Sequence, residues 1–511
     1  MNEKLNQFKK DIVTKRVAVL GIGISNTPLI RYLGKMGVQI TAFDAAEASA
    51  LETTMDVLKE FDIKYSLGPN YLDGLHGFDV IFKTPKVRFD IPALLREAEA
   101  GVEITSEMEV FCKLCPARVF AVTGSDGKTT TTTLIYRILT QHGYKCWLGG
   151  NIGTPLLDRI DEIAQDDMVI LELSSFQLHT MRNRIHTAVV TNLSPNHLDV
   201  HTSMQEYSDA KKNIFLYQSE FDTLVANYDN DTTRKFTEEA PGKVIFFSRG
   251  KSLDEGVILS GNRIFYRTGR QEHHIIDTED IFIPGLHNVE NYMAAIGATI
   301  DFVDAGDVKA VATTFRGVEH RNEHVRDLNG VSFYNDSIGS SPTRTIASLN
   351  AFKKPVILIA GGYDKNIPYD VLGETLVDRV KCLVLLGQTA GKIEKALQDE
   401  IGRTGRGADI PVIHCASMEE AVKCAYERAL NGVAKDRAVK DGVEKDRAVK
   451  DGVSDASVDR KKNASEDKIK DVSEDTSGNE IVLLSPASAS FDMYKSFEAR
   501  GQDFKKIVNS I

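Results

Sequence analysis

The segment with the strongest chemical signal runs from Thr123 to Thr130 and reads TGSDGKTT. It stands between an apolar run typical of a strand and a stretch, TTTTTLIYRILTQHG, typical of a helix. A glycine-rich turn that enters a helix points backbone N–H groups at phosphates, and a lysine there neutralises β- and γ-phosphate oxygens. The sequence therefore predicts a nucleotide site, with Lys128 on the phosphates and Thr129 or Thr130 on Mg²⁺. The turn itself consists of Gly124, Ser125, Asp126 and Gly127.

A second glycine turn, GIGISN, extends from Gly21 to Asn26 and also follows an apolar run. Asp44 ends the next apolar run, where a ribose or base contact is expected. Asn26 stands where the dinucleotide fingerprint has its third glycine, which disfavours NAD or FAD. A nucleotide-sugar site of the Rossmann type and a purely structural turn both remain open. In the first case the contacts are Gly23, Ile24, Ser25 and Asp44.

Three further polar residues follow the first turn in order: Glu172 in LELSSFQL, His197 in TNLSPNHLDVH and Lys211 in YSDAKKNIF. Glu172 ends an apparent strand, and open α/β sheets place their ligands at that edge. A carboxylate and an imidazole there suit a divalent metal. Singly, a hydrogen-bonded His197 and a solvated Lys211 would need no function. Their joint order after a phosphate-binding turn is what favours a metal-assisted site.

The elements that must position these residues alternate between strands and helices. Runs rich in Val and Ile, each ending in Gly, Asp or Ser, recur with amphipathic stretches between them, which is typical of βαβ units and parallel sheets. The runs form three blocks, for which we predict α/β domains at residues 1–106, 107–316 and 317–511.

One segment, residues 433–478, breaks this alternation. It has no aromatic residue, no Leu and a near-tandem decapeptide, AKDRAVKDGV followed by EKDRAVKDGV. So polar a stretch buries too little apolar surface to offset its ordering entropy. We expect a mobile, disordered surface insertion, and a tolerated loop expansion rather than a partner site.

Composition excludes several classes of protein. The 511 residues include 62 Lys and Arg against 73 Asp and Glu, which gives a formal charge of −11. Such a negative charge disfavours binding to the phosphate backbone of nucleic acids. We find no secretory signal and no apolar run long enough to span a membrane, so we expect a cytoplasmic protein. Six cysteines are too few for a disulfide scaffold, and we read the pair Cys112 and Cys115 as reduced thiols on one helical turn.

Nine blocks, in this order, carry a resemblance to a known family. They are TGSDGKTT (Thr123 to Thr130), GGNIGTP (Gly149 to Pro155), ELSSFQL (Glu172 to Leu178), SPNHLDVH (Ser194 to His201), GLHNVEN (Gly285 to Asn291), EHRNE (Glu319 to Glu323), NDS (Asn335 to Ser337), GGYDK (Gly361 to Lys365) and LSPASASFDMYKSFEARG (Leu484 to Gly501). In these blocks the chain resembles the ATP-dependent Mur ligases of bacterial cell-wall synthesis, most closely the members that add D-glutamate. The resemblance covers nearly the whole chain except residues 433–478.

The resemblance implies a Rossmann-like N-terminal domain for the UDP part, a central P-loop ATPase domain with a mostly parallel sheet, and a Rossmann-like C-terminal domain for the amino acid. It implies an amide ligase that activates the carboxylate of UDP-N-acetylmuramoyl-L-alanine as an acyl phosphate with ATP. The amine of D-glutamate then attacks, which yields the amide, ADP and phosphate. We expect such an enzyme to act as a monomer.

The resemblance also assigns roles to single residues. Phosphoryl transfer between anions depends on positioning and charge neutralisation. By position, Lys128 holds the phosphates, Thr129 and Glu172 share one Mg²⁺, His197 holds a second, and Lys211 is a lysine that the family carries as a carbamate. The remaining ATP contacts are Asn288, Asn291, Arg321 and Asp336, and Asn151 matches a contact to the UDP substrate.

For D-glutamate, the resemblance assigns Lys365, Ser490 and Phe497 to the amino-acid pocket. The chain departs from other members at Ile338 and Ser340, which stand where some carry a Lys and a Thr near the glutamate. Two other functions stay open. One is a sister ligase that adds a different amino acid, and the other is an ATP-binding protein without catalysis, which would be expected to lack one of its catalytic residues.

Overall fold

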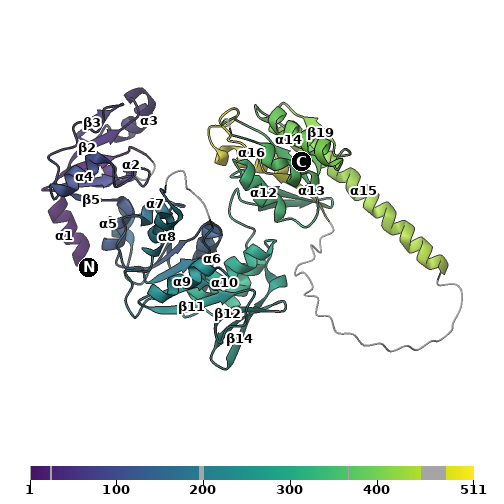
Figure 1. Ribbon diagram of the computed structural model, residues 1–511, viewed down its shortest axis with the longest axis horizontal. Helices are drawn as coiled ribbons and strands as arrows, with labels where there is room; N and C mark the ends of the chain where they lie inside the picture. Colours follow the sequence, from purple (N-terminus) through teal and green to yellow (C-terminus); the bar gives the residue numbers. More distant parts are fainter. Residues whose placement is uncertain (1, 24–25, 195–200, 366, 451–478) are drawn as a thin grey trace. The chain divides into compact units, whose positions relative to one another are not determined.

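The computed structural model describes residues 2–23, 26–194, 201–365, 367–450 and 479–511, with backbone alone for 435–450 (Figure 1). The chain divides into two compact units. Unit 1 contains residues 1–277 and 287–311, and unit 2 contains residues 278–286 and 312–511. Among the described residues, strands form three sheets of five, nine and six strands. Their mixed α/β character confirms the predicted fold class, whereas the boundaries at 106 and 316 stay predictions.

The first sheet, in unit 1, is parallel and has the order β3-β2-β1-β4-β5. β1 is apolar and buried after its first residue, as expected for a strand covered on both faces. Its strands are β1 (Arg16–Leu20), β2 (Gln39–Asp44), β3 (Ile63–Leu67), β4 (Val80–Lys83) and β5 (Glu103–Thr105). Its helices are α1 (Glu3–Ile12), α2 (Asn26–Lys35), α3 (Ala48–Leu58) and α4 (Pro92–Glu99).

The central sheet, also in unit 1, has the order β14-β13-β12-β11-β10-β9-β6-β8-β7. It is parallel from β7 to β12, and the hairpins joining β12, β13 and β14 make its far edge antiparallel. Its strands are β6 (Arg118–Thr123), β7 (Cys146–Gly150), β8 (Met168–Glu172), β9 (Thr187–Val190), β10 (Thr223–Asn227), β11 (Lys243–Ser248), β12 (Glu255–Ser260), β13 (Arg263–Thr268) and β14 (Gln271–Asp277). Its helices are α5 (Glu107–Leu114), α6 (Lys128–His142), α7 (Ser175–Leu178), α8 (Met204–Lys212), α9 (Asp231–Phe236), α10 (Leu286–Thr299) and α11 (Ala305–Thr314), with short 3₁₀ turns at η1 (Leu157–Glu162) and η2 (Thr237–Glu239). The 3₁₀ turn η3 (Thr278–Asp280) belongs to unit 2.

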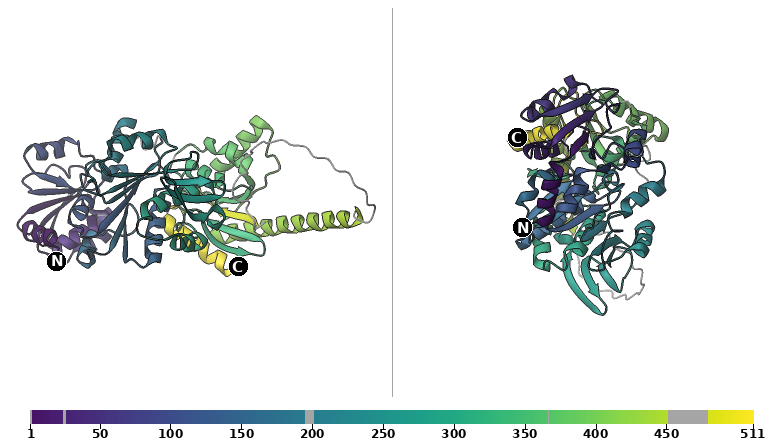
Figure 2. Two further views of the ribbon diagram at one scale, coloured as in Figure 1. Left: turned by 90° about the horizontal axis from the view of Figure 1, so that it is seen from below. Right: turned by 90° about the vertical axis from the view of Figure 1, so that its left-hand side faces the viewer.

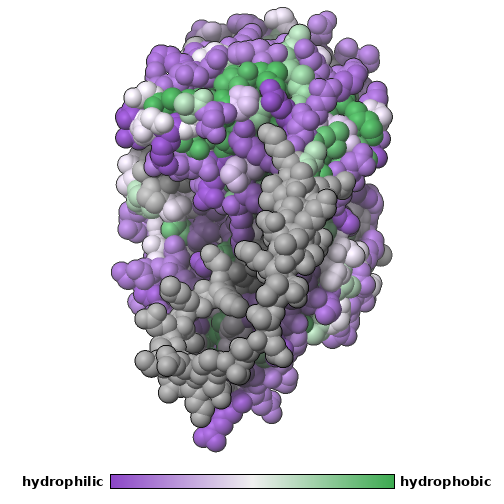
Figure 3. Space-filling model, turned by 90° about the vertical axis from the view of Figure 1, so that its right-hand side faces the viewer, coloured by the Kyte–Doolittle hydropathy of each residue, from purple (hydrophilic) through white to green (hydrophobic). Residues whose placement is uncertain are grey.

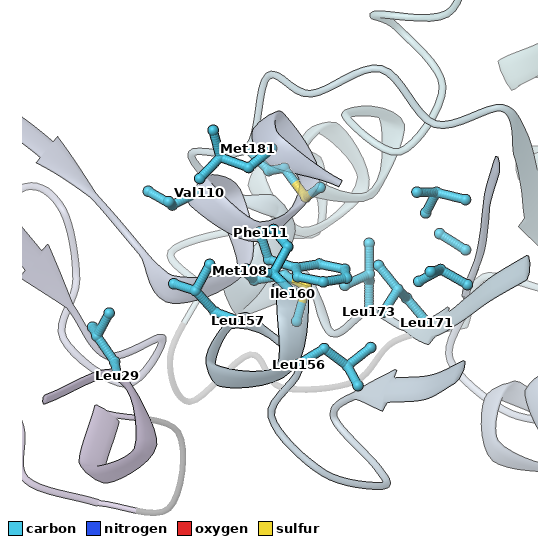
Figure 4. Packing of buried hydrophobic residues seen from close by; sticks show 14 of the residues in the cluster. Leu29, Met108, Val110, Phe111, Leu156, Leu157, Ile160, Leu171, Leu173 and Met181 are labelled. Carbon is cyan, nitrogen blue, oxygen red and sulfur yellow. The ribbon is translucent and has the colours of Figure 1, made fainter. Parts of the chain in front are cut away.

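One hydrophobic cluster joins the first two sheets within unit 1. Leu29 of α2 belongs to the same buried cluster as Phe111 of α5, Leu157 of η1 and Leu171 of β8 (Figure 4). Because the cluster is continuous, the first and central sheets share one core. The cysteines of α5 border it: Cys112 and Cys115 are free, and burial raises the pKa of both thiols, which keeps them protonated.

The third sheet, in unit 2, has the order β15-β16-β20-β17-β18-β19 and is parallel except between β15 and β16. Its strands are β15 (Glu323–Leu328), β16 (Val331–Asn335), β17 (Val356–Ala360), β18 (Val380–Leu385), β19 (Val412–His414) and β20 (Glu480–Leu484). Its helices are α12 (Pro342–Asn350), α13 (Gly373–Arg379), α14 (Ala390–Thr404), α15 (Met418–Lys450) and α16 (Phe497–Ser510), and η4 (Asp370–Leu372) is a 3₁₀ turn.

The polar segment behaves differently from our expectation in its first part. We predicted a disordered insertion from residue 433, whereas α15 continues as helical backbone to Lys450 and extends away from the rest of unit 2 (Figures 1 and 2). Ten of the 18 residues from 433 to 450 are Ala, Lys, Arg or Glu, and these residues have high helix propensity, which favours a helix here despite the few apolar residues. The remainder, 451–478, lies outside the described residues.

Hydrophilic residues predominate on the face shown in Figure 3, and hydrophobic residues gather there only in small groups. No helix within the described part of the chain combines the length and the apolar character needed to cross a bilayer.

Candidate active site

The phosphate-binding turn lies where β6 ends and α6 begins, and backbone geometry requires glycine at two of its positions. Gly124 has φ +148°, and a Cβ there would lie 2.0 Å from Thr191 Oγ1. Gly127 has φ +78°, and its Cβ would lie 2.3 Å from Asn291 Oδ1. Side chains other than glycine would be strained at these φ values and would also clash, so the turn stays narrow and presents backbone to a ligand.

The loop after β9 holds the turn in place. Thr191 Oγ1 donates to the Asp126 carbonyl oxygen at 2.6 Å, and the Asp126 N–H donates to Asn192 Oδ1 at 2.9 Å. Ser125 Oγ donates to the Ser194 carbonyl oxygen at 2.9 Å. These contacts follow from sheet order, because β9 is the neighbour of β6.

Lys128 folds back over the turn. Its Nζ donates to the carbonyl oxygens of Gly124 and Ser125, both at 2.9 Å. The ammonium group therefore lies directly over the backbone that a P-loop uses to hold phosphates. The hydroxyls of the two following residues, Thr129 and Thr130, stand in the first turn of α6 and are both buried.

Glu172 ends β8, the other neighbour of β6, and only 1% of its surface is exposed. Its Oε1 accepts a hydrogen bond from Asn151 Nδ2 at 2.9 Å, and the Asn151 N–H donates to the Glu172 carbonyl oxygen at 2.8 Å. Its Oε2 is buried and has no hydrogen-bond partner among the described residues. A buried carboxylate oxygen left bare is costly, and a cation at that oxygen would compensate it. The carboxylate therefore fits a Mg²⁺ site.

Lys211, in α8, is 1% exposed and reaches the turn from the other side. Its Nζ donates to Thr123 Oγ1 at 3.1 Å and to the Gly124 carbonyl oxygen at 2.9 Å. Burial, together with the nearby charge of Lys128, lowers the pKa of Lys211 well below its usual value, although Glu172 opposes the shift. A buried lysine that readily loses its proton is a nucleophilic amine rather than a fixed cation.

Helix α10 supplies two amides to the same place. Asn291 Nδ2 donates to Asn288 Oδ1 at 3.1 Å, and Thr131 Oγ1 in α6 donates to Asn291 Oδ1 at 3.2 Å. Both predicted ATP contacts of unit 1 therefore lie against the helix that follows the phosphate-binding turn.

Two side chains, those of Asp44 and Asn26, form hydrogen bonds with the backbone of the glycine turn in the first sheet and the residues beside it. Asp44 accepts from the Ile22 N–H at 2.7 Å and from the Ala46 N–H at 2.9 Å. The amide of Asn26, 1% exposed, donates to the carbonyl oxygens of Leu20 and Gly21, both at 3.0 Å. Asn26 thus fixes the turn without a third glycine. No atom of the described residues lies within 4 Å of a Cβ placed on Gly23.

In unit 2, Asp336 follows β16 and is buried. Its Oδ2 accepts from Ser348 Oγ at 2.5 Å and from Ser485 Oγ at 2.7 Å, and burial raises its pKa to about 6. Arg321 is close enough for its charge to oppose that rise. The buried Nε of Arg321 has no hydrogen-bond partner in the part of the chain described. Unit 2 therefore presents an arginine donor beside a carboxyl group.

The residues expected around the amino acid lie on two segments of unit 2: Lys365 follows β17, and Ser490 and Phe497 belong to the stretch from β20 into α16. Ser490 is buried, Lys365 is exposed, and Phe497 begins α16 with its ring 6.0 Å from that of His320. Arg500, which we did not single out, joins the segment after β20 to the loop after β16. Its guanidinium donates to the Ser337 hydroxyl and carbonyl oxygens at 3.0 and 2.9 Å, and to the carbonyl oxygens of residues 488 and 489 at 3.1 and 3.0 Å.

Comparison with known proteins agrees with this geometry. The Mur ligase middle domain matches residues 122–299, and the Mur ligase glutamate ligase domain matches residues 320–437. The UDP-N-acetylmuramoylalanine–D-glutamate ligase of Acetivibrio thermocellus is 57% identical over 511 residues, with 100% of both chains covered. The corresponding ligase of Ruminiclostridium cellulolyticum is 51% identical, again over 100% of both chains. The chain belongs to the Mur ligase family.

A solved structure of a Mur ligase supports the fold. UDP-N-acetylmuramate-alanine ligase MurC from Thermotoga maritima has a TM-score of 0.53 with this chain at 18% identity, and the match covers 97% of this chain and 99% of that one. At that identity the likeness shows a shared fold only.

Within this Mur ligase, unit 1 brings together most of the residues expected to handle phosphate. Lys128, Glu172, Lys211, Asn288 and Asn291 all lie at or beside the turn after β6. Asn151, which we expected at the UDP substrate, contacts Glu172 directly. His197, Ile24 and Ser25 lie outside the described residues.

Sequence reasoning missed two residues that act on the site of this Mur ligase. Thr123 accepts from Lys211 and donates its own hydroxyl proton to the Leu173 carbonyl oxygen at 2.8 Å. The residue stood in the TGSDGKTT block, so a polar residue at the end of a buried strand was the available signal. Arg500 stood in the last block, but its partners lie more than ten residues away on other loops, and no local pattern identifies them.

Proposed function

We propose that this Mur ligase joins D-glutamate to UDP-N-acetylmuramoyl-L-alanine in peptidoglycan precursor synthesis. The reaction consumes ATP and passes through an acyl phosphate of the L-alanyl carboxylate, and it requires Mg²⁺. The bond that forms is an amide between that carboxyl carbon and the amine of D-glutamate, and ADP and phosphate leave.

The observation that carries the proposal is the cluster at the carboxyl ends of β6 and β8. A buried carboxylate with one unpartnered oxygen, Glu172, lies on the strand next to a glycine turn that already holds two lysines, Lys128 and Lys211. Transfer of a phosphoryl group to a carboxylate brings several anionic oxygens together, so a site of cations around a metal-binding carboxylate suits this chemistry.

Different side chains are proposed to bind the phosphates, the metal ions and the rest of the nucleotide. The backbone of Gly124 to Gly127 and the ammonium group of Lys128 would hold the β- and γ-phosphates of ATP. Glu172 and Thr129 would hold one Mg²⁺, which supplies charge neutralisation when bound. His197 is proposed for a second Mg²⁺. Asn288, Asn291, Arg321 and Asp336 are proposed to hold the rest of the nucleotide.

Lys211 is proposed to act as a carbamate. Its neutral amine attacks the carbon of CO₂, one N–C bond forms, and one proton leaves to water, which gives an anion with two oxygens. The lowered pKa supports this step, because only the unprotonated amine is nucleophilic. The carbamate would orient a Mg²⁺, whereas the unmodified ammonium would repel one.

The amino acid and the nucleotide sugar have proposed sites of their own. Lys365, Ser490 and Phe497 would form the D-glutamate pocket in unit 2. Gly23, Ile24, Ser25 and Asp44 would hold the UDP part, with Asn151 nearer the reacting carboxylate.

Phosphate release by the purified protein with ATP, Mg²⁺ and UDP-N-acetylmuramoyl-L-alanine tests the proposal. D-glutamate should support release and a new UDP-linked product, whereas L-glutamate, L-alanine, L-lysine and diaminopimelate should not. Release of phosphate with another amino acid would indicate that the protein has the activity of a sister Mur ligase and does not add D-glutamate. Absence of release with every amino acid, in a protein that still binds ATP, would favour a non-catalytic role and contradict the proposal.

A further inference from the structure

A buried lysine stands at the place where the first sheet should bind its ligand. In the strand order β3-β2-β1-β4-β5, β2 and β3 are added on one side of β1, and β4 and β5 are added on its other side. The switch point of an open parallel sheet therefore falls between β1 and β4, and ligands lie in the crevice outside the carboxyl ends of such strands. Lys83 is the last residue of β4 and pairs with Leu20, the last residue of β1.

Lys83 also adjoins the glycine turn. The next residue, Thr84, donates its N–H to the Leu20 carbonyl oxygen at 3.0 Å, and its methyl group would lie 2.8 Å from a Cβ on Gly21. The turn and the lysine are thus neighbours on one edge of the sheet.

This lysine is 3% exposed, and no hydrogen bond or ion pair joins its ammonium group to another described residue. Burial lowers its pKa, and the charge of Glu109 partly opposes that shift. A largely buried cation without a hydrogen bond or ion pair to the described chain is costly, and the charge of Glu109 offsets only part of that cost. The cost is accounted for if an anion from outside the protein completes the environment of Lys83.

Glu109, in the first turn of α5, is the second unpartnered group near Lys83. Its Oε2 is buried and accepts no hydrogen bond within the described chain. A direct ion pair is the simplest structural role for Lys83 and Glu109, but the two groups do not form one. An occupant that satisfies both must offer an anionic oxygen to the lysine and a hydrogen-bond donor to the carboxylate. A diphosphate joined to a sugar has both features.

We propose that Lys83 and Glu109 form a subsite for the diphospho-sugar part of the substrate. The Lys83 ammonium group binds the diphosphate, and the Glu109 carboxylate accepts a hydrogen bond from a hydroxyl or amide N–H of the adjoining sugar. This inference rests on the proposed function, because that function supplies a UDP-linked sugar.

Affinity for three ligands tests the subsite: uridine, UDP and UDP-N-acetylmuramoyl-L-alanine, measured by calorimetry or by ligand-observed NMR where binding is weak. Lys83→Met should weaken the affinity for UDP by about tenfold or more, because a hydrogen bond to a charged group is lost. The affinity for uridine should stay unchanged. Glu109→Ala should weaken the affinity for the full substrate and leave the affinity for UDP unchanged. Glu109→Gln keeps an acceptor oxygen and should therefore lose less affinity for the full substrate.

Lys86→Ala is the matched control, because Lys86 is exposed three residues after Lys83 and should leave all three affinities unchanged. The KM for ATP should stay constant in every variant. Equal losses for uridine and UDP in Lys83→Met would indicate a scaffold role and overturn the subsite, as would unchanged affinities in that variant. Wild-type protein that binds none of the three ligands would overturn the proposed function and the subsite with it.

Discussion

Lys211 donates a hydrogen bond from Nζ to the carbonyl oxygen of Gly124 at 2.9 Å, so a lysine from α8 is fixed to the first residue of the phosphate-binding turn. The two residues are 87 positions apart in the sequence. Their contact places an amine of lowered pKa within the proposed ATP site, where we propose that CO₂ modifies it.

Replacing Lys211 by Ala should therefore reduce ligation by about a hundredfold or more, because a metal-orienting group is lost. Added formate or acetate should restore part of the rate, since either supplies the missing carboxylate. The measurement is phosphate release with and without the added carboxylate. Lys211→Met, which keeps most of the volume, separates loss of chemistry from loss of packing.

Lys212→Ala is the matched control for that experiment. Lys212 is its neighbour in α8 but pairs with Glu239 at 2.5 Å and lies away from the turn. We expect near-normal ligation in this variant. Full activity in Lys211→Ala would remove Lys211 from the mechanism.

Glu172→Gln should raise the Mg²⁺ concentration needed for half-maximal activity and lower kcat by about a hundredfold or more. The same change should leave the free energy of unfolding unchanged or raise it by about 1 kcal/mol, because it removes a buried charge with an unpartnered oxygen. A Mg²⁺ titration of the ligation rate and a urea unfolding curve give the two quantities. Lower stability with a normal Mg²⁺ requirement would show a structural role instead.

The phosphate-binding turn could be predicted because its signal is local. A strand, a glycine turn, a lysine and a helix follow one another within one short segment, and the structure forms all four. Glu172 was predicted from its place at the end of an apparent strand, and Lys211 from its order after the turn and from the family resemblance. Their approach to the turn follows from the pairing of β8 with β6 and from the packing of α8, neither of which a short motif encodes.

Other features needed the folded chain. Asn26 counted against a dinucleotide turn, but no local rule shows that its amide would bind the carbonyl oxygens of Leu20 and Gly21. Arg500 makes its contacts on other loops, and Lys83 reaches the glycine turn only through the pairing of β4 with β1, so no local pattern marks either residue. The helical start of the polar segment was missed because the prediction rested on its lack of apolar residues and did not consider helix propensity.

Gly127→Ala should lower the free energy of unfolding by about 1–2 kcal/mol, because its φ of +78° is unfavourable for a side chain, and the clash with Asn291 adds to this. The KM for ATP should rise in the same variant. Urea unfolding and steady-state kinetics measure the two effects, and Gly127→Ala/Asn291→Ala should recover only the part due to the clash.

Gly143→Ala is the control at the other end of α6. Gly143 has φ +111°, but no atom in the described part of the chain lies within 4 Å of its added Cβ. It should therefore lose stability through backbone strain alone and keep the wild-type KM for ATP. An equal rise in that KM for both variants would contradict a specific role for Gly127.

The pH dependence of unit 2 should carry the signature of Asp336. Burial raises its pKa in the folded protein to about 6, above the usual value of 3.8. The folded state therefore binds the proton more tightly than the unfolded chain, so this group costs stability above pH 6, and the cost is relieved as the pH falls from about 6 to about 4. A shift of this size corresponds to about 3 kcal/mol. Asp336→Asn should remove this cost. Protection from hydrogen exchange should therefore rise at pH 7.5 and change little at pH 4.5.

Protection factors from hydrogen exchange in β16 and β20, corrected for the intrinsic exchange rate, measure this effect. Asp327→Asn supplies a control of opposite sign. Burial favours a higher pKa for Asp327, but hydrogen bonds from Ser332 and His324 outweigh it and lower the pKa. Asp327 therefore contributes stability above its unfolded pKa and loses it as the pH falls, so Asp327→Asn should reduce protection at pH 7.5. A pH profile of Asp336→Asn that matches the wild type would show that Asp336 is ionised without cost in the fold.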